Sequence, residues 1–437
     1  MGSEGSNILT EVKGKLFLDV DYEDPYVQPL LIAALKARLS PDLLVFVNEL
    51  THPPPLEARL LQWRQYESVD FECLLAHPKT CLANSYVIRK ALIRKHYLSV
   101  TISHWLTKHP GDARLQNHVK AGVEFEVDYA EFLDDALVEA FELRESWARN
   151  SSLEAEEKDP EWWILKPGMS ERGQGIRLFS SEEDLVEIFE GWDPASDDED
   201  GGSDGDGDTD EKATGIMTSQ LRHFVAQPYI HPPLLMPPSH PSAGRKFHIR
   251  TYVLAVGALK VYVYRPMLAL FAAHDYGAPS AENDELGSHL TNTCLQTGER
   301  EGSVHAFWSL PSHLLSLSDP TPADDWRENV FTQICGTTSA TFEAAARTSS
   351  THFQPLPNAF EIFGLDFLID AEGTAWLLEV NAFPDFGQSG DGEGRDVVQG
   401  LFEGVVEVGV RPFLELGPSG NGDEDMVEVL DLDMGRR

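Results

Sequence analysis

The stretch FGLDFLIDAEGTAWLLEVN, residues 363–381, contains two runs rich in β-forming residues on either side of Glu372-Gly373. This pattern predicts a β-hairpin with a tight turn. With those two residues as the turn, Asp366 lies directly opposite Glu379. Because side chains alternate between the faces of a strand, Asn381 projects to the same side as Glu379. The hairpin therefore predicts two carboxylates and an amide on one patch of a sheet.

This patch predicts a metal site. Carboxylates that face each other destabilise a sheet unless a cation or a proton neutralises them. Mg²⁺ suits oxygen ligands, keeps several waters and commonly bridges protein carboxylates to nucleotide phosphates. We therefore predict that Asp366, Glu379 and Asn381 bind Mg²⁺. The alternative is a solvated polar face, which the surrounding apolar residues disfavour because they indicate a sheet in the core.

A second stretch, GRKFHIRTYVLAVGALKVYVYR at residues 244–265, also predicts a hairpin. With Gly257-Ala258 as a two-residue turn, Arg250 faces Arg265, and Lys246 and His248 project to the same side as Arg250. Two opposed guanidiniums repel each other unless an anion lies between them, so this pair predicts a carboxylate or phosphate clamp. The alternative is that each arginine pairs with a separate acidic residue.

A third stretch, WWILKPGMSERGQGIRL at residues 162–178, is a strand, a glycine-rich loop and a second strand. Glycines let a backbone close over phosphates, and Lys166 supplies a positive charge to them. The loop matches neither the Walker pattern nor the dinucleotide fingerprint, because both lead into a helix. Taken alone, this stretch could equally be an ordinary glycine hairpin.

In their order along the chain, these stretches resemble the tubulin–tyrosine ligase family of ATP-grasp enzymes. The resemblance runs from about residue 84 to residue 388, and its strongest marks are WWILKPGMSERGQGI, FVAQPYIHPPLL, GRKFHIRTYVL, VYVYR, HLTNTCLQ and FGLDFLID followed by WLLEVNAFP. It implies an α/β (α+β) chain with the ATP-grasp fold. In that fold, a small N-terminal α/β lobe precedes central and C-terminal lobes whose antiparallel sheets enclose ATP.

The resemblance also implies a reaction. In this family ATP phosphorylates a carboxylate, and an incoming amine then displaces phosphate to form an amide. The chain would be an ATP-dependent ligase that uses ATP and Mg²⁺ to add an amino acid, tyrosine or glutamate, to a protein tail such as that of tubulin. No residue need act as a covalent nucleophile, because orientation and charge neutralisation supply the catalysis.

Residue roles follow from the same motifs. The residues expected to act in catalysis are Arg250, Arg265, Glu379 and Asn292. Those expected to bind the nucleotide are Lys90, Lys166, Gly173, Gly175, Gln227, Tyr229, Ile230, Lys246, His248 and Thr291. The backbone from Gln227 to Ile230 would read adenine. The chain departs from the family at His248, where an acidic residue usually contacts the ribose, and at Pro228, where a lysine is usual, which puts the affinity for ATP in question.

The chain divides by pattern into four parts. We predict an N-terminal α/β lobe at residues 1–110, a central lobe at 111–235, a C-terminal catalytic lobe at 236–415 and an acidic tail at 416–437. The acidic run at 193–211 contains no Lys or Arg and almost no apolar residue, so we expect a disordered insertion there. Within the lobes, helical spacing at 56–66 and at 126–150 predicts one helix in each segment.

Composition limits the classes of function. The net charge of the 437-residue chain is −38, which argues against general binding of nucleic acid or anionic membranes because the field repels both. No apolar run has the length of a membrane-spanning helix, so we expect a soluble, cytoplasmic protein. The four cysteines, with no Cys-x-x-Cys pair, favour a reducing compartment.

Two other functions stay open. The chain could be an ATP-binding interaction module that keeps the ATP-grasp fold with little turnover and recruits basic partners through its acidic segments. It could also be a ligase for a small metabolite. The predicted metal ligands and the arginine pair favour an enzyme.

Overall fold

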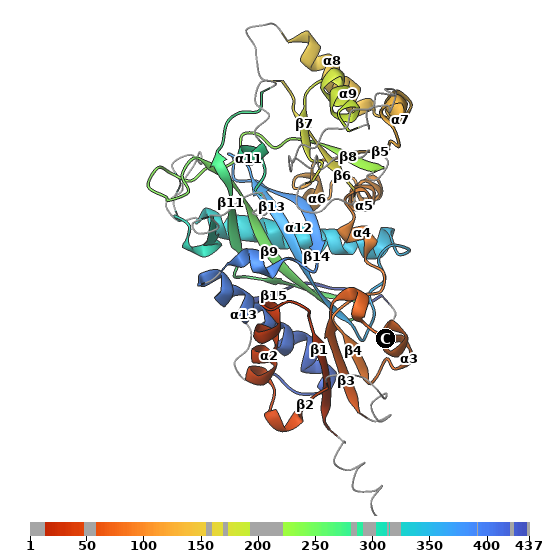
Figure 1. Cartoon of the computed structure of the whole chain (residues 1–437), viewed down its shortest axis with the longest axis vertical. Coiled ribbons are helices and arrows are strands. Elements are labelled where there is room, and N and C mark those ends of the chain that lie inside the picture. Colours follow the sequence, from red (N-terminus) through yellow and green to blue (C-terminus); the bar gives the residue numbers. More distant parts are fainter. Residues whose placement is uncertain are drawn as a thin grey trace, which may run out of the picture.

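The computed structural model describes residues 14–47, 58–153, 160–168, 174–192, 222–280, 286–291, 303–312, 314, 325–390, 392–419 and 424–434. Three sheets follow one another along the long axis of the molecule (Figure 1), with the N-terminal sheet at the bottom, the C-terminal sheet in the middle and the central sheet at the top. No helix in these ranges is both long and apolar enough to cross a membrane.

The N-terminal sheet is entirely parallel, with the order β2-β1-β3-β4. Its strands are β1 (Leu16–Asp21), β2 (Leu44–Phe46), β3 (Arg59–Arg64) and β4 (Cys81–Ala83), accompanied by the helices α2 (Val27–Arg38) and α3 (Phe71–Ala76). The predicted helix at 56–66 is wrong, because this segment forms β3. Central parallel strands are buried on both faces and read as a continuous apolar run, which periodicity cannot distinguish from a buried helix.

The central sheet is antiparallel, with the order β5-β8-β6-β7. Its strands are β5 (Val123–Glu126), β6 (Trp163–Pro167), β7 (Arg177–Phe179) and β8 (His223–Pro228). The helices of this part of the chain are α4 (Lys90–Ile93), α5 (Lys95–Lys108), α6 (Ala113–Gln116), α7 (Leu133–Ala136), α8 (Phe141–Ser152) and α9 (Glu182–Glu190). The predicted single helix at 126–150 is wrong, since the segment contains the end of β5, α7 and most of α8. The predicted insertion at 193–211 lies outside the described residues.

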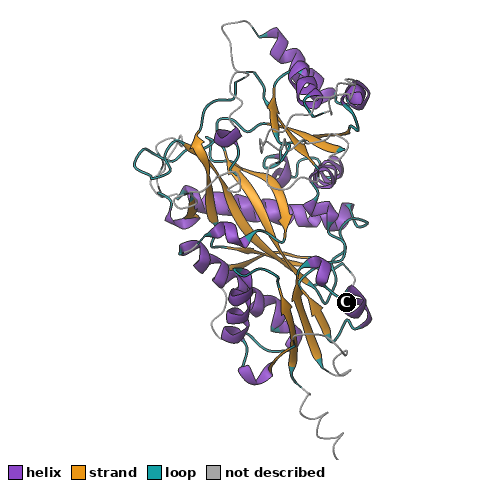
Figure 2. Ribbon diagram, in the orientation of Figure 1, coloured by secondary structure: helices purple, strands orange, loops and turns teal. Residues whose placement is uncertain are grey.

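The C-terminal sheet has seven strands, and β9 lies at its centre. Its strands are β9 (Arg245–Val256), β10 (Lys260–Tyr264), β11 (Leu268–Asp275), β12 (Val304–Ala306), β13 (Phe360–Ile369), β14 (Ala375–Ala382) and β15 (Met426–Asp431). Its helices are α11 (Leu286–His289), α12 (Trp326–Thr348) and α13 (Glu393–Val405). Figure 2 shows the long α12 lying across this sheet. The seven strands thus form the framework of the predicted catalytic lobe.

One strand of this sheet comes from the segment predicted to be a separate acidic tail. β15 pairs antiparallel with β10, from Lys260↔Asp431 to Tyr264↔Met426. The acidic side chains concealed the strand, because they project from an edge strand while Met426 packs into the core. A separate tail beginning at residue 416 is therefore wrong.

The turns of the two predicted hairpins differ from the expected two-residue turns. β9 and β10 pair as Val256↔Lys260, so three residues connect them, with Gly257 at φ +60°. β13 and β14 pair as Ile369↔Ala375, which leaves a five-residue connection. A bulge between Asp366 and Phe367 then shifts the register by one residue, as bulges do.

The cores cross the boundaries between the lobes. One cluster joins Leu18 and Trp63 of the N-terminal sheet to Phe360 and Phe402 of the C-terminal lobe. The Trp63 ring lies 5.1 Å from the Phe360 ring and 6.0 Å from the Phe402 ring, measured between centroids. The N-terminal lobe is therefore built onto the C-terminal sheet.

Candidate functional site

A cleft with a volume of about 700 Å³ lies between the central and C-terminal sheets. Side chains from β6 and β8 line it on one side, and side chains from β9, β13 and β14 line it on the other. Residues of the N-terminal lobe, including Tyr22 and Tyr66, line its far end. The cleft is therefore a junction of all three lobes.

The predicted metal ligands Asp366, Glu379 and Asn381, called the acidic set here, lie together in this cleft. Asp366 pairs directly with Glu379 between β13 and β14, as the hairpin predicted. The Nδ2 of Asn381 lies 3.1 Å from Oε1 of Glu379 and 3.4 Å from Oδ2 of Asp366. The register at Asp366 matches the prediction because the bulge, with Leu378 as its extra residue, compensates for the longer turn.

Arg250 binds the carboxylate of Asp366 and does not form the predicted clamp with Arg265. Its Nε lies 2.6 Å from Oδ1 of Asp366 and its Nη2 lies 3.1 Å from Oδ2, which is a bidentate pair. β9 places Arg250 opposite Asp366 on one side and Leu268 on the other. Both side chains of the pair are buried. Burial opposes the charge, yet the Asp366 carboxylate holds the pKa of Arg250 above its ordinary value.

The predicted opposition of Arg250 and Arg265 is wrong. The three-residue connection shifts the register of β9 and β10 by one residue, so Arg265 does not fall opposite Arg250, and Leu268 of β11 holds that position. Arg265 instead lies 2.5 Å from Glu328, and its guanidinium is 4.3 Å from the centroid of the Trp308 ring. It is not among the residues that line the cleft.

Lys95, the first residue of α5, forms an ion pair with Glu379 in the cleft. No motif in the sequence indicated this role. The Nζ of Lys95 lies 3.1 Å from Oε2 of Glu379. Although burial alone would raise it, the pKa of Glu379 is held well below its usual range by Lys95, by the Asn381 hydrogen bond and by Lys166. Glu379 is therefore a carboxylate that stays ionised.

Two lysines bring buried positive charge to the cleft, one from each sheet. Lys166 on β6 donates to Oε1 of Gln227 at 2.8 Å, and Lys246 on β9 donates to the hydroxyl of Tyr229 at 2.8 Å. Neither lysine forms an ion pair within the described ranges. Burial lowers the pKa of Lys166 to about 8, and burial together with the charge of Lys166 lowers the pKa of Lys246 to about 7. Such cations favour a bound anion.

Neutral polar groups lie between these charges. Nδ1 of His248 lies 2.5 Å from Oγ1 of Thr291, and its Nε2 lies 3.6 Å from Oδ1 of Asp366. Burial lowers the pKa of His248, so the ring is neutral near pH 7. The Tyr229 hydroxyl lies 2.9 Å from Nδ1 of His289. His248 and Thr291 thus line the cleft.

The segment from Gln227 to Ile230, called the hinge here, forms one edge of the cleft. The N–H of Tyr229 donates to the carbonyl of Trp162 at 2.7 Å, and Pro228 has no N–H. Gln227 pairs with Ile164 in the β6–β8 ladder, so we expect Ile230 to supply the hinge N–H for a ligand. Lys120 also lines the cleft, with its Nζ 3.7 Å from the centroid of the Trp376 ring.

The remaining predicted residues have different positions. Lys90 is exposed at the start of α4 and does not line the cleft. Its position therefore does not fit the predicted role in nucleotide binding. Lys95 and Lys120 are the lysines that line the cleft on that side. Gly175 is described and has φ +73°, which favours glycine. Gly173 and Asn292 lie outside the described residues.

Comparison with known proteins places the chain in a family. A family model described as the tubulin-tyrosine ligase family matches residues 92–416. A probable tubulin–tyrosine ligase of Schizosaccharomyces pombe is 43% identical over 421 residues, which cover 96% of this chain and 97% of that protein. The probable tubulin–tyrosine ligase PBY1 of Saccharomyces cerevisiae is 37% identical over 448 residues, which cover 98% of this chain and 56% of that protein.

A solved structure supports the fold. The C-terminal domain of K. lactis Pby1, described as an ATP-grasp enzyme interacting with the mRNA decapping enzyme Dcp2, matches with a TM-score of 0.68 and 35% identity. The match covers 96% of this chain and 99% of that chain. The predicted ATP-grasp fold is confirmed, and this chain belongs to the tubulin–tyrosine ligase family.

Proposed function

We propose that the chain is an ATP-dependent carboxylate–amine ligase that joins an amino acid, tyrosine or glutamate, to a protein C-terminal tail such as that of tubulin. The observation that carries the proposal is the pair of buried lysines, Lys166 and Lys246, which face an acidic set in the same cleft. A site that holds phosphates needs such cations, and a site that holds the accompanying metal needs such carboxylates.

The nucleotide would span the cleft from the hinge to the lysines. The Ile230 N–H would hydrogen-bond to adenine, and Lys166 and Lys246 would contact the phosphates. Gly175 lies where β7 begins and would let the backbone approach the same phosphates. His248 would contact the ribose as a neutral ring, which replaces the acidic residue usual in the family by a weaker hydrogen-bonding group.

The acidic set fits Mg²⁺ in the chemistry of its donors. Asp366, Glu379 and Asn381 form one hydrogen-bonded group of two carboxylates and an amide, and the low pKa of Glu379 keeps its carboxylate charged. The amide Nδ2 faces both carboxylates, so the Asn381 amide would turn over to present its oxygen to an ion. We propose that these three residues hold the ion. When bound, Mg²⁺ neutralises the phosphate oxygens during transfer.

Arg250 would act on the reacting groups from the same side. Its Nε and Nη2 hold Asp366, so Nη1 stays available for a substrate carboxylate or for the acyl phosphate formed from it. In the reaction, the substrate carboxylate attacks the γ-phosphorus and ADP leaves. The amine then attacks the acyl carbon, phosphate leaves, and the amine loses a proton. Arg250 thereby orients and neutralises the groups and forms no covalent bond itself.

Phosphate release tests the proposal. The protein is given ATP, Mg²⁺ and a panel of amino acids, with and without tubulin or peptides of its tails. We expect release that requires both an amino acid and an acceptor, and a Glu379→Gln variant that binds ATP but loses turnover by at least about a hundredfold. Glu343→Gln on α12, distant in sequence and outside the cleft lining, is the control.

Saturable ATP binding without acceptor-dependent release contradicts the ligase. It would support the nucleotide-binding interaction module instead, a class that the decapping-enzyme contact described for the K. lactis protein makes concrete. Release that needs an amino acid but no protein acceptor would point to a small-molecule ligase.

A further inference from the structure

Exposed apolar side chains gather on one corner of the central lobe. Seven large apolar residues are exposed among the described residues, and four of them lie between residues 129 and 145. They are Tyr129, Phe132, Val138 and Phe141, and Phe141 is 64% exposed. Soluble proteins rarely gather large exposed apolar residues in this way unless the surface binds something. We call residues 129–145, which contain α7 and the start of α8, the α7–α8 corner (Figure 1).

The exposure is not a failure of the local core. In the same segment, Leu133, Leu137, Ala140 and Leu143 are buried in the core of the central lobe. The segment therefore presents one apolar set inward and a second apolar set outward. Tyr129 and Phe132 lie next to each other, with ring centroids 6.3 Å apart in an edge-to-face arrangement.

The α7–α8 corner is strongly acidic. Residues 129–145 contain six acidic residues and a single arginine. The acidic residues are Glu131, Asp134, Asp135, Glu139, Glu142 and Glu145, all exposed and none in a salt bridge with another described residue. The arginine, Arg144, donates to the carbonyl of Val138 at 3.3 Å. Apolar groups surrounded by unpaired carboxylates favour a partner that combines apolar side chains with positive charge.

A groove beside the corner supplies an anchor point. It has a volume of about 480 Å³, and its lining includes Glu142 and Glu145 of α8 together with Trp162. Arg149 also lines it, but this charge is already paired with Glu161 at 2.7 Å. The groove thus has room and negative charge for a lysine or arginine side chain.

The groove also reaches the hinge. Pro228 and Tyr229 line both this groove and the proposed nucleotide cleft. A group bound in the groove would contact the segment proposed to hold adenine. Occupation of the groove and binding of ATP would therefore be coupled, and by linkage each would change the affinity for the other.

We propose that the α7–α8 corner and its groove dock a basic amphipathic segment of another protein, whose apolar side chains cover Phe132 and Phe141 and whose cation enters beside Glu142 and Glu145. Anionic membranes and nucleic acids do not fit this surface, because its carboxylates repel them. The proposal concerns a surface outside the catalytic cleft and stands whether or not the chain is a ligase.

A synthetic peptide tests the proposal with the intact protein. The probe is a fluorescent 18-residue helix of leucine and lysine in amphipathic order, and its control has the same composition in scrambled order. Fluorescence anisotropy should show saturable binding of the ordered peptide, weakened by salt, with the scrambled peptide binding about tenfold more weakly.

Two surface variants separate the apolar and the charged contributions. Phe132→Ser with Phe141→Ser should weaken binding of the ordered peptide about tenfold or more, and Glu142→Gln with Glu145→Gln should reduce both the affinity and its salt dependence. Leu75→Ser is the matched control, since Leu75 is a similarly exposed residue on α3 in the N-terminal lobe.

Three results would overturn the proposal. Equal binding of the ordered and scrambled peptides would show that charge alone attracts them. Unchanged binding of the ordered peptide to the variant with both Phe132→Ser and Phe141→Ser would place the contact elsewhere. Light scattering could instead show a concentration-dependent dimer that Phe132→Ser with Phe141→Ser abolishes. A second copy of the chain, and not a basic partner, would then cover the corner.

Discussion

Lys166 and Lys246 are the residues on which the proposed binding of nucleotide would depend most directly. Each is at least 90% buried, and each donates to a neutral oxygen rather than to a carboxylate. Burial lowers the pKa values of both ammonium groups into the range where they titrate near neutral pH. The charge that we propose attracts phosphates is therefore one that the folded protein holds only weakly.

Binding of ATP should weaken as the pH rises from 7 to 9. In the free protein the lysines lose protons around pH 7 and 8, whereas phosphates bound beside them favour the protonated forms. Binding must then take up protons, and the Kd should rise by about tenfold per pH unit for each lysine above its pKa. Calorimetry in two buffers with different ionisation enthalpies measures this uptake.

Lys90→Met is the matched control for that experiment, because Lys90 is exposed and outside the cleft lining. It should keep the pH dependence of the wild-type protein, whereas Lys246→Met should remove the part centred near pH 7. A Kd that does not change between pH 7 and 9 would mean that these lysines do not contact the phosphates.

Lys166→Met should stabilise the nucleotide-free protein. The pKa of Lys166 is lower in the folded protein than in the unfolded chain, so between about pH 8 and 10.5 the unfolded chain binds more protons and stability rises with pH. Below this window the buried charge costs its full penalty. Removing it should raise the free energy of unfolding by about 1–2 kcal/mol at pH 7, as measured by urea unfolding.

Saturating ATP should remove the stability advantage of Lys166→Met over the wild-type protein. The wild-type protein should gain more thermal stability from saturating ATP than the methionine variant gains, since the bound phosphates compensate the wild-type charge. A variant that is less stable without nucleotide would show that Lys166 is a structural residue.

At the scale of elements, the hairpins show how far sequence reasoning reaches. The strands β9, β10, β13 and β14 follow from their β-forming runs, and alternation brings Lys246, His248 and Arg250 to one face. The turn lengths do not follow, because Gly257 and Gly373 fit connections of several lengths. In the β9–β10 hairpin the wrong turn length led to the wrong prediction that Arg265 faces Arg250. In the β13–β14 hairpin the bulge at Leu378 restored the predicted register. Lys95 could not be found, since its role depends on where α5 meets β14.

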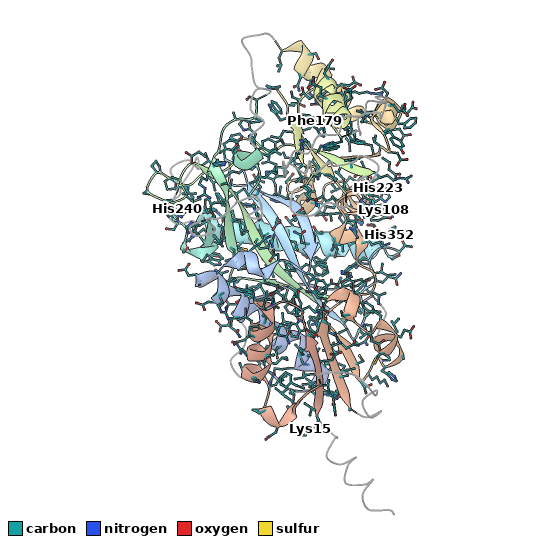
Figure 3. The ribbon with its side chains drawn as sticks, in the orientation of Figure 1. Lys15, Lys108, Phe179, His223, His240 and His352 are labelled. Carbon is teal, nitrogen blue, oxygen red and sulfur yellow. The ribbon has the colours of Figure 1, made fainter. Side chains whose placement is uncertain are left out.

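A ladder of four rings links the elements around the glycine loop. The His223, His96, Tyr97 and His352 rings follow one another with centroid separations of 4.8, 4.3 and 4.4 Å. They join β8 to α5 and to the segment after α12, and Figure 3 labels the two end members, His223 and His352. His96 lies directly behind Gly168, where a Cβ atom would be 2.6 Å from its Nδ1.

Gly168→Ala should therefore weaken ATP binding. The added methyl group would collide with His96 and push the end of β6 away, and Lys166 lies only two residues earlier. We expect an affinity loss of about tenfold, measured by intrinsic tryptophan fluorescence. His96→Ala in the same chain should recover most of the loss because it removes the imidazole. Failure of the double variant to recover would exclude this contact as the cause.

At the scale of the whole molecule, the N-terminal and C-terminal lobes share a core. Trp63 is 1% exposed and packs its ring against Phe360 of β13 and Phe402 of α13. The sequence predicts an order of lobes, because each segment has its own pattern of strands and helices. Their docking cannot be predicted in this way, since the contacts join residues about 300 positions apart, as Trp63 and Phe360 do.

Trp63→Ala should separate the unfolding of the N-terminal lobe from that of the rest. Truncating a buried aromatic costs about 3–5 kcal/mol, and here the cavity lies between two lobes. Differential scanning calorimetry should show an early transition that the wild-type protein lacks. Trp192→Ala, in the core of the central lobe, should lower stability without that early transition. A single shifted transition for Trp63→Ala would mean that the lobes unfold as one unit.

The pairing of β15 with β10 orders events during synthesis. A ribosome releases the chain from its N-terminus, so β9, β10 and β13 emerge long before residues 426–431. Until those residues appear, β10 presents an open edge of backbone donors and acceptors to any other nascent strand. A premature stop before Met426 would leave that edge open permanently. Such a truncated product should accumulate in aggregates or be degraded, even though it retains every residue that lines the cleft.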